Sequence, residues 1–326
     1  MANPNVGQQV AAAWQKLIGT KPEDNIFDEY SLLALMEKGK ASKAVTGGRS
    51  VIAPIEYKVN STVKAISDTE TLDVSRVDVF DEAEYEWAQY AGDFVISSYE
   101  EAITRGGEKK IDLLEGKAEN LRQSMRKRLN EDAFGDGTTD SSKSADGLQV
   151  LVPDDPTAGT RGGISAVTYS FWRSQQTTGT KTTSAYDNLR SSMRTINTSC
   201  ARGQGVMTPT DFITGPTTAN GYESLLIANE RIVSKENSQA NAGFDDDAFM
   251  FKKAKVRWDD DCADSRMYAL RFGKGGLQLA YQSGYWFKAY PAVNPANQLL
   301  DVIKIETICQ FAAFNPRHLG VITVIT

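Results

Sequence analysis

The sequence has few of the residues on which enzyme chemistry usually depends. Its 326 residues include a single histidine, His318, so a Ser/His/Asp triad has one candidate base and a multi-histidine metal site is excluded. The glycines within 135–137 and 161–163 lack the flanking strand, lysine and helix of a phosphate-binding loop. We therefore expect no catalytic, cofactor-binding or metal-binding residues, and we interpret His318 as part of a turn between two strands.

Cysteine and long apolar runs are also scarce. The three cysteines, Cys200, Cys262 and Cys309, are odd in number and widely spaced, which indicates neither a disulfide framework nor a zinc site. We interpret them as small apolar residues in a reducing compartment. No stretch approaches the roughly 18 consecutive apolar residues of a membrane helix, and the N-terminus does not resemble a signal peptide. The sequence predicts a protein made in the cytoplasm, with no membrane partner.

The charge of the chain makes one class of function less plausible. Its net charge is −6 at pH 7, so the whole chain is not a nucleic-acid binder that neutralises phosphates. The aspartate runs 245–247 and 259–261 could in principle hold a hard cation. Consecutive aspartates point to different sides of a chain, however, so we expect solvated loops at both places.

A long hairpin is predicted near the N-terminus. Apolar residues alternate with polar ones from Val51 to Val59, which is the pattern of a half-buried strand. The segment Ser61–Asp73 is polar, and we expect a return strand through Val74, Val77 and Val79. The tip of this hairpin has too little apolar material to bury itself against its own domain. It is either a surface hairpin or an arm that lies across a neighbouring subunit.

A long amphipathic helix is predicted over residues 108–134. Its apolar residues recur at steps of three and four, over about five turns. The opposite face is rich in lysine and arginine, and we interpret it as a solvated surface rather than one that faces DNA. The predicted core face consists of Ile111, Leu114, Leu121, Met125 and Leu129.

The remaining pattern mixes short strands and helices. We expect strands at 83–87, 148–152 and 302–311, and helices that start at Ser97–Ser98, Tyr186 and Asn220. Because helices and strands mix without a regular βαβ period, the predicted fold class is α+β.

The order of these pieces resembles the HK97-fold major capsid proteins of tailed bacteriophages over nearly the whole chain. The run Phe134–Thr138 followed by Gly147-Leu148 looks like the exit of the family's long helix. The stretches Phe171–Gln176 and Tyr290–Gln298 also look like phage capsid sequences. The resemblance implies an HK97-type capsid fold with an N-terminal arm at 1–46, an extended hairpin called the E-loop at 47–81, a peripheral domain with a long spine helix at 82–150, an axial domain at 151–300 and a return strand to the peripheral domain at 301–326.

The resemblance also implies a function without catalysis. Hexamers and pentamers of such a protein self-assemble in the host cytoplasm into an icosahedral head, the capsid of the virion, which encloses double-stranded DNA held by weak nonspecific contact. The implied partners are the protein itself, portal and scaffolding proteins and, in some cases, a decoration protein. Scaffolding would be a separate protein, or a leader would be removed. The implied intersubunit contacts of the E-loop are Glu56, Lys58, Lys64, Asp68, Glu70, Asp73 and Arg76.

Three other functions remain open from the residues. An encapsulin-like compartment shell shares the fold but encloses enzymes, and a tail component would form tubes or rings. A soluble hydrolase that uses carboxylates belongs to a different class and would be a monomer with an acidic cleft. Some capsid proteins also cross-link a hairpin lysine to an asparagine of a neighbour, for which this chain offers Lys58 or Lys64 and Asn294 or Asn297.

Overall fold

The computed structural model describes residues 31–38, 41–103, 107–180, 187–203, 206–229, 244–245, 248–273 and 275–325. The chain divides into two compact units. The first contains Gln89–Leu129 and Gly284–Thr307, together with Met1–Glu29, which lies outside the described residues. The second contains Tyr30–Ala88, Asn130–Ser283 and Ile308–Thr326.

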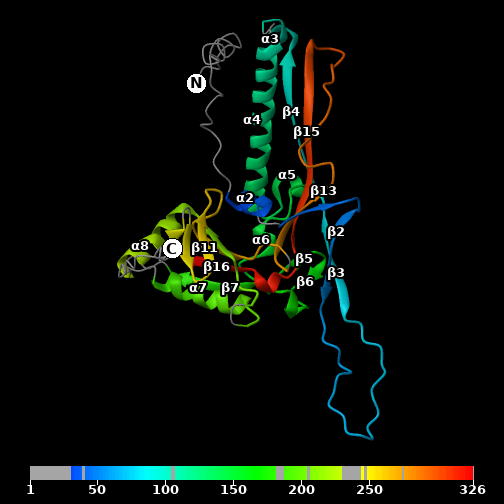
Figure 1. Ribbon diagram of the computed structural model, residues 1–326, viewed down its shortest axis with the longest axis vertical. Helices are drawn as coiled ribbons and strands as arrows, with labels where there is room; N and C mark the ends of the chain where they lie inside the picture. Colours follow the sequence, from blue (N-terminus) through cyan, green and yellow to red (C-terminus); the bar gives the residue numbers. More distant parts are fainter. Residues whose placement is uncertain are drawn as a thin grey trace, which may run out of the picture. The chain divides into compact units, whose positions relative to one another are not determined.

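The first unit is built on long elements. Helix α4 (Gly107–Ala133) runs alongside strands β4 (Ala88–Ser97) and β15 (Leu300–Ala313), as Figure 1 shows. Strand β15 pairs with β4 and, antiparallel, with β14 (Lys288–Ala289). Gly92 of β4 lies so close to α4 that a Cβ there would come within 2.7 Å of a Leu121 methyl group. The short helix α3 (Ser98–Ile103) follows β4 directly.

The second unit contains a seven-stranded mixed sheet. Its strand order is β7-β16-β12-β8-β11-β10-β9, formed by Gln175–Thr180, Gly320–Ile325, Arg266–Leu270, Asp211–Thr214, Ala254–Trp258, Ala248–Phe251 and Phe244–Asp245. Helix α7 (Asp187–Cys200) packs on β7 and β16 with a buried face of Leu189, Met193, Ile196 and Cys200. The helix predicted at Tyr186–Cys200 is thereby confirmed over Asp187–Cys200, with its apolar residues in the core, while Tyr186 lies outside the described residues.

The hairpin of the second unit is displaced along the sequence from its predicted position. Strand β2 (Ser50–Glu56) pairs antiparallel with β3 (Phe80–Glu86), in the register Ser50↔Glu86 to Glu56↔Phe80. The first strand is therefore confirmed, but a return strand at 74–79 is wrong, and Val74 is 94% exposed. The segment that we predicted as a separate strand at 83–87 provides the return strand instead.

Two further elements correct the sequence analysis. Residues Leu148–Leu151 form a helical turn, α6, with Leu148 and Leu151 buried one turn apart, where we had expected a strand. Helix α8 (Pro216–Asn229) begins four residues before the expected cap at Asn220, and proline is favoured at a first helical position. The remaining elements are α2 (Ser31–Lys38), β1 (Ser42–Val45), α5 (Thr139–Ser142), β5 (Thr160–Arg161), β6 (Ile164–Ser165), the 3₁₀ turn η1 (Ser170–Trp172), β13 (Leu277–Gln282) and the 3₁₀ turn η2 (Pro316–His318).

Candidate assembly interface

The base of the hairpin, formed by β2 and β3, packs firmly within the second unit. Val51, Ala53, Ala83 and Tyr85 alternate along the two strands and are all buried, so one face of this ribbon belongs to the core. The Tyr85 hydroxyl donates a hydrogen bond to the Ala313 carbonyl at 2.9 Å. The ribbon thus has a fixed root.

The hairpin arm, residues 57–79, continues from this root without further strand structure (Figure 1). The Tyr57 N–H still donates to the Val79 carbonyl at 3.1 Å. Beyond that pair the arm exposes large apolar side chains to solvent. They are Val59 (85% exposed), Val63 (80%), Ile66, Leu72 and Val74. Single exposed apolar residues are ordinary, but five within one projecting segment are typical of a surface that binds a partner.

The sequence analysis missed these apolar residues as contacts and named charged ones. All seven named residues, Glu56, Lys58, Lys64, Asp68, Glu70, Asp73 and Arg76, are exposed. The structure brings only Lys64 and Glu70 together, as an ion pair at 3.1 Å. The sequence analysis assigned Val59 and Val74 to apolar strand faces, whereas both are exposed in the structure. Val63, Ile66 and Leu72 have no periodic spacing within the polar segment, so the sequence did not single them out.

Other named residues of the arm shape the arm itself. The carboxylate of Asp73 accepts a hydrogen bond from the Ser75 N–H at 2.9 Å, and this bond lowers the pKa of Asp73. Arg76 forms an ion pair with Asp78 at 3.3 Å. Contacts between groups this exposed contribute little to stability. Their effect is to bias the path of the arm.

The predicted core face of α4 is only partly described. Leu129 and Met125 are buried, whereas Leu121 is half-buried. The side chains of Ile111 and Leu114 lie outside the described residues. The C-terminal half of α4 therefore has its apolar face inward, and the rest of that face stays a prediction.

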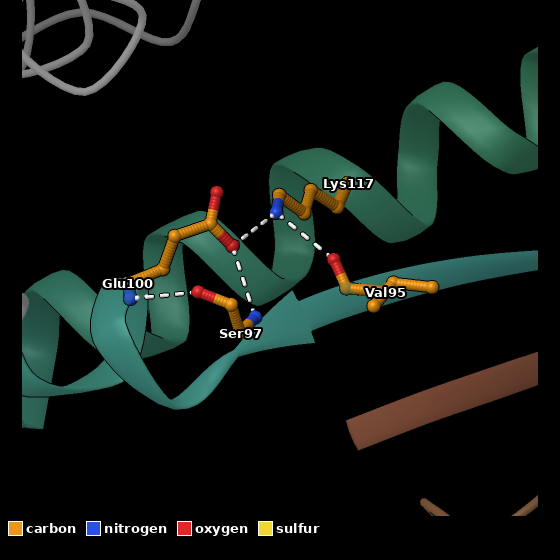
Figure 2. A network of polar contacts seen from close by, with 4 residues as sticks. All are labelled: Val95, Ser97, Glu100 and Lys117. Carbon is orange, nitrogen blue, oxygen red and sulfur yellow. Dashed lines mark hydrogen bonds and ion pairs between the residues drawn. The ribbon is translucent and has the colours of Figure 1, made fainter. Parts of the chain in front are cut away.

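A network of polar contacts joins β4, α3 and α4 within the first unit (Figure 2). Ser97 and Glu100 form a capping box, because the Glu100 N–H donates to Ser97 Oγ at 3.1 Å and the Ser97 N–H donates to Glu100 Oε2 at 3.2 Å. Lys117 of α4 donates to Glu100 Oε2 at 2.9 Å and to the Val95 carbonyl at 3.1 Å. Burial raises the pKa of Glu100, but the bonds from Lys117 and Ser97 outweigh it, and the pKa is lowered overall.

Asp259 corrects the expectation of a solvated loop at 259–261. Its side chain is buried and accepts hydrogen bonds from the Leu32 N–H at 3.2 Å and from the Asn130 amide at 3.0 Å. Because Leu32 is in the first turn of α2, the carboxylate satisfies a helix N–H that would otherwise be unpaired. Asp259 is thus a structural tether, while Asp246 and Asp247 lie outside the described residues.

The cysteines and the histidine are all buried side chains. All three cysteines are free and buried, and burial raises the pKa of Cys200 and Cys309 to about 12. His318 is buried in η2 between β15 and β16, as predicted for a turn. Among the described residues no group of three or more His, Cys, Asp or Glu side chains could hold a metal ion. Within the same ranges no helix is long and apolar enough to cross a membrane.

Comparison with known proteins defines the class of fold. No family model matches the chain, and no curated protein matches its sequence. Solved structures of capsid shells do match. The chain is similar to a capsid protein of cyanophage A-1(L), with 16% identity, a TM-score of 0.63, and coverage of 93% of this chain and 95% of that one. The protein therefore has the HK97-type capsid fold, which is α+β as predicted.

Two further structures show the range of shells that share this fold. The capsid of Myoviridae phage XM1 is 10% identical, with a TM-score of 0.58 and full coverage of both chains. The SrpI encapsulin of Synechococcus elongatus PCC 7942 is 11% identical, with a TM-score of 0.61, and the match covers 99% of this chain and 96% of that one. The fold is thus common to phage capsids and an encapsulin.

Proposed function

We propose that the chain is the major capsid protein of a tailed bacteriophage, which assembles as hexamers and pentamers into an icosahedral head around double-stranded DNA. The observation that carries the proposal is the hairpin arm, whose apolar side chains are exposed in a single copy. Full-length similarity to capsid proteins supports it. In this role the protein has no catalytic activity and is located in the virion after assembly in the host cytoplasm.

The apolar residues of the arm supply most of the association energy in this proposal. Burying one valine or leucine side chain contributes about 1.5–3 kcal/mol, whereas an exposed ion pair contributes about 0 to 1 kcal/mol. Val59, Val63, Leu72 and Val74 therefore outweigh the charged residues of the arm if a neighbouring subunit covers them. The charged residues then select the register of the contact.

The domain assignment follows the same proposal. We assign the N-terminal arm to 1–46, the E-loop to 47–81, the peripheral domain to 82–150, the axial domain to 151–300 and the return strand to 301–326. The pairing of β2 with β3 supports a hairpin at this place in the chain, with β3 continuing to Glu86, beyond the assigned end of the E-loop. The seven-stranded sheet, formed largely by residues 175–270, supports an axial domain in the second half of the chain.

The proposed partners beyond the protein itself are portal and scaffolding proteins, a decoration protein in some assemblies, and packaged DNA. The stretch Arg122–Arg128 of α4 supports a local DNA contact, because it has four basic residues and no acidic one. The net charge of −6 keeps such contacts weak and nonspecific.

A second candidate is an encapsulin-like compartment, which the match to the SrpI encapsulin favours. The two functions differ in what the shell encloses. Nuclease-protected DNA inside purified particles supports the phage head, whereas enclosed protein without DNA supports the compartment.

The first test is electron microscopy of the purified protein, expressed with and without a scaffolding protein. Closed shells, or rings of five and six subunits, are the expected result. Tubes would point to a tail component. Monomers at high concentration even with scaffold present would overturn the capsid proposal.

A further inference from the structure

The turn between β5 and β6 forms a socket for the root of the hairpin. The Glu84 N–H of β3 donates to the Gly162 carbonyl at 3.0 Å. Gly162 also approaches the ribbon so closely that a Cβ there would lie 2.9 Å from Tyr85 Cζ and 3.0 Å from Ala83 Cβ. Its φ of +53° is in the left-handed region, which glycine adopts without strain. The turn therefore contacts the hairpin at its base.

Arg161, the residue before Gly162, is almost completely buried, with 2% of its surface exposed. Its guanidinium donates to four backbone carbonyls, those of Val150 at 3.1 Å, Trp172 at 3.2 Å, and Pro156 and Ala158 at 3.3 Å. The Trp172 indole N–H in turn donates to the Arg161 carbonyl at 2.9 Å. The side chain thus joins three separate stretches of chain around the turn.

The chemistry of this site requires arginine. A planar guanidinium has five N–H donors in a fixed fork, so it can hold several carbonyls at once, whereas a lysine ammonium is a point charge on a flexible stem. The hydrogen-bond partners found are carbonyl dipoles rather than a carboxylate. Burial lowers the pKa of Arg161, which shows that the charge is held at some cost in solvation.

The 3₁₀ turn η1, to which Arg161 is hydrogen-bonded, contacts the start of the hairpin arm. Phe171, next to Trp172, lies with its ring centroid 6.0 Å from that of Tyr57, the first residue of the arm. Trp172 is bound to Arg161 both through its carbonyl and through its indole. The guanidinium is therefore linked to the hairpin root by two routes, through Gly162 to Glu84 and Tyr85, and through Trp172 and Phe171 to Tyr57.

We propose that Arg161 is a positioning residue that fixes the socket on which the hairpin arm is seated, and so sets the direction in which the arm meets a neighbouring copy. This inference rests on the proposed function for its assembly consequence. The seating itself is a property of the isolated chain.

The test compares two variants by hydrogen exchange and by assembly. Arg161→Lys keeps the positive charge but loses the planar set of N–H donors of the guanidinium. Gly162→Ala keeps the arginine and pushes a methyl group toward Tyr85. In both we expect the Glu84 amide to exchange about tenfold faster, while amides of β12 and β16 keep their protection, because the socket opens locally. We also expect the yield of shells or capsomer rings to fall about tenfold, since the arm no longer docks in one direction.

Arg271→Lys is the matched control, because Arg271 also donates to a carbonyl, that of Thr208 at 3.1 Å, and takes part in neither route to the hairpin. It should leave Glu84 exchange and assembly unchanged. Equal acceleration of hairpin and sheet amides in Arg161→Lys would show a general loss of stability and overturn the proposal, as would normal exchange at Glu84. If the parent protein itself does not assemble, the proposed function fails, and the exchange experiment still decides the role of Arg161.

Discussion

At the scale of single residues, His318 illustrates how a buried side chain can make stability depend on pH. Its Nδ1 lies 2.6 Å from the Cys200 carbonyl. A carbonyl oxygen only accepts, so Nδ1 carries the proton of the neutral ring, and Nε2 is the atom that would take up another. Burial lowers the pKa of His318, the bond to Cys200 opposes this, and Arg202, Arg271 and Arg317 add to the lowering.

The sign of the pH effect follows from this lowered pKa. Well above pH 6.5, the ordinary pKa of about 6.5 for histidine, the imidazole is neutral in both folded and unfolded chains. As the pH falls below that value, the unfolded chain binds the proton first, so the free energy of unfolding decreases until the folded His318 is also protonated. Because the sequence has one histidine, no other imidazole obscures this window.

We predict that His318→Asn reduces the pH dependence of stability between pH 7 and 5.5. Asparagine keeps an N–H donor for the Cys200 carbonyl but does not titrate, so the variant has a flatter profile even if its stability at pH 7 is lower. Urea unfolding at a series of pH values measures how the free energy of unfolding changes with pH in the parent and in the variant. Parallel slopes for parent and variant would show that His318 does not cause the acid loss.

At the scale of elements, the contact of Lys117 with the capping box couples α4 to the end of β4. We predict that Lys117→Met lowers the free energy of unfolding by about 1–2 kcal/mol at pH 7, because Glu100 loses its charged donor. Lys127→Met is a matched control on the same helix. Lys127→Met makes the same chemical change, and we expect it to lower the free energy of unfolding by less than Lys117→Met does.

The pH dependence of this difference provides a second check. The folded pKa of Glu100 is lowered, so its contribution to stability is present above the ordinary carboxyl pKa of about 4.5 and is lost as the pH falls through the folded value. The difference in the free energy of unfolding between the parent and Lys117→Met should therefore narrow progressively as the pH falls below about 4.5. A difference that stays the same size as the pH is lowered would rule out Glu100 as its cause.

Several elements could be predicted from local patterns. The 3.6-residue period places α4 and α7, and the Ser97/Glu100 spacing places the start of α3. Alternation also predicts a strand at 83–87, but it does not show that this strand is the partner of β2. Its position depends on contacts with Gly162 and Ala313, which are distant in the sequence.

The candidate site was less predictable than the fold. A charged, polar hairpin tip was expected, and the exposed apolar residues within it have no period to reveal them. The burial of Asp259 depends on Leu32 and Asn130, each more than a hundred residues away. The short run 148–152, apolar except for Gln149, is equally consistent with a strand or a helical turn, since such short runs do not distinguish the two.

At the scale of the whole molecule, the arm should separate folding from assembly. We predict that Val59→Ser with Val74→Ser leaves the thermal unfolding midpoint within about 2 °C of the parent, since both side chains are exposed in the single chain. The same variant should lose most of its shell formation. The control Glu56→Gln with Lys58→Gln, also on the exposed hairpin, should assemble nearly normally.

Light scattering and electron microscopy of both double variants measure how many shells each one forms. The opposite result would be normal shells from Val59→Ser with Val74→Ser and failed assembly of Glu56→Gln with Lys58→Gln. It would show that the charged residues supply most of the association energy. Deletion of Ser61–Asp73 should give a folded subunit that forms no shells.

The exposed valines of the arm also have a consequence for temperature. Apolar surface that leaves water on association gives a negative heat-capacity change, and its driving force near room temperature is largely entropic. Contacts made through Val59, Val63, Leu72 and Val74 therefore weaken on cooling. A particle joined in this way assembles more readily when it is warm. Cooling weakens the contacts between its subunits before it unfolds the subunits themselves.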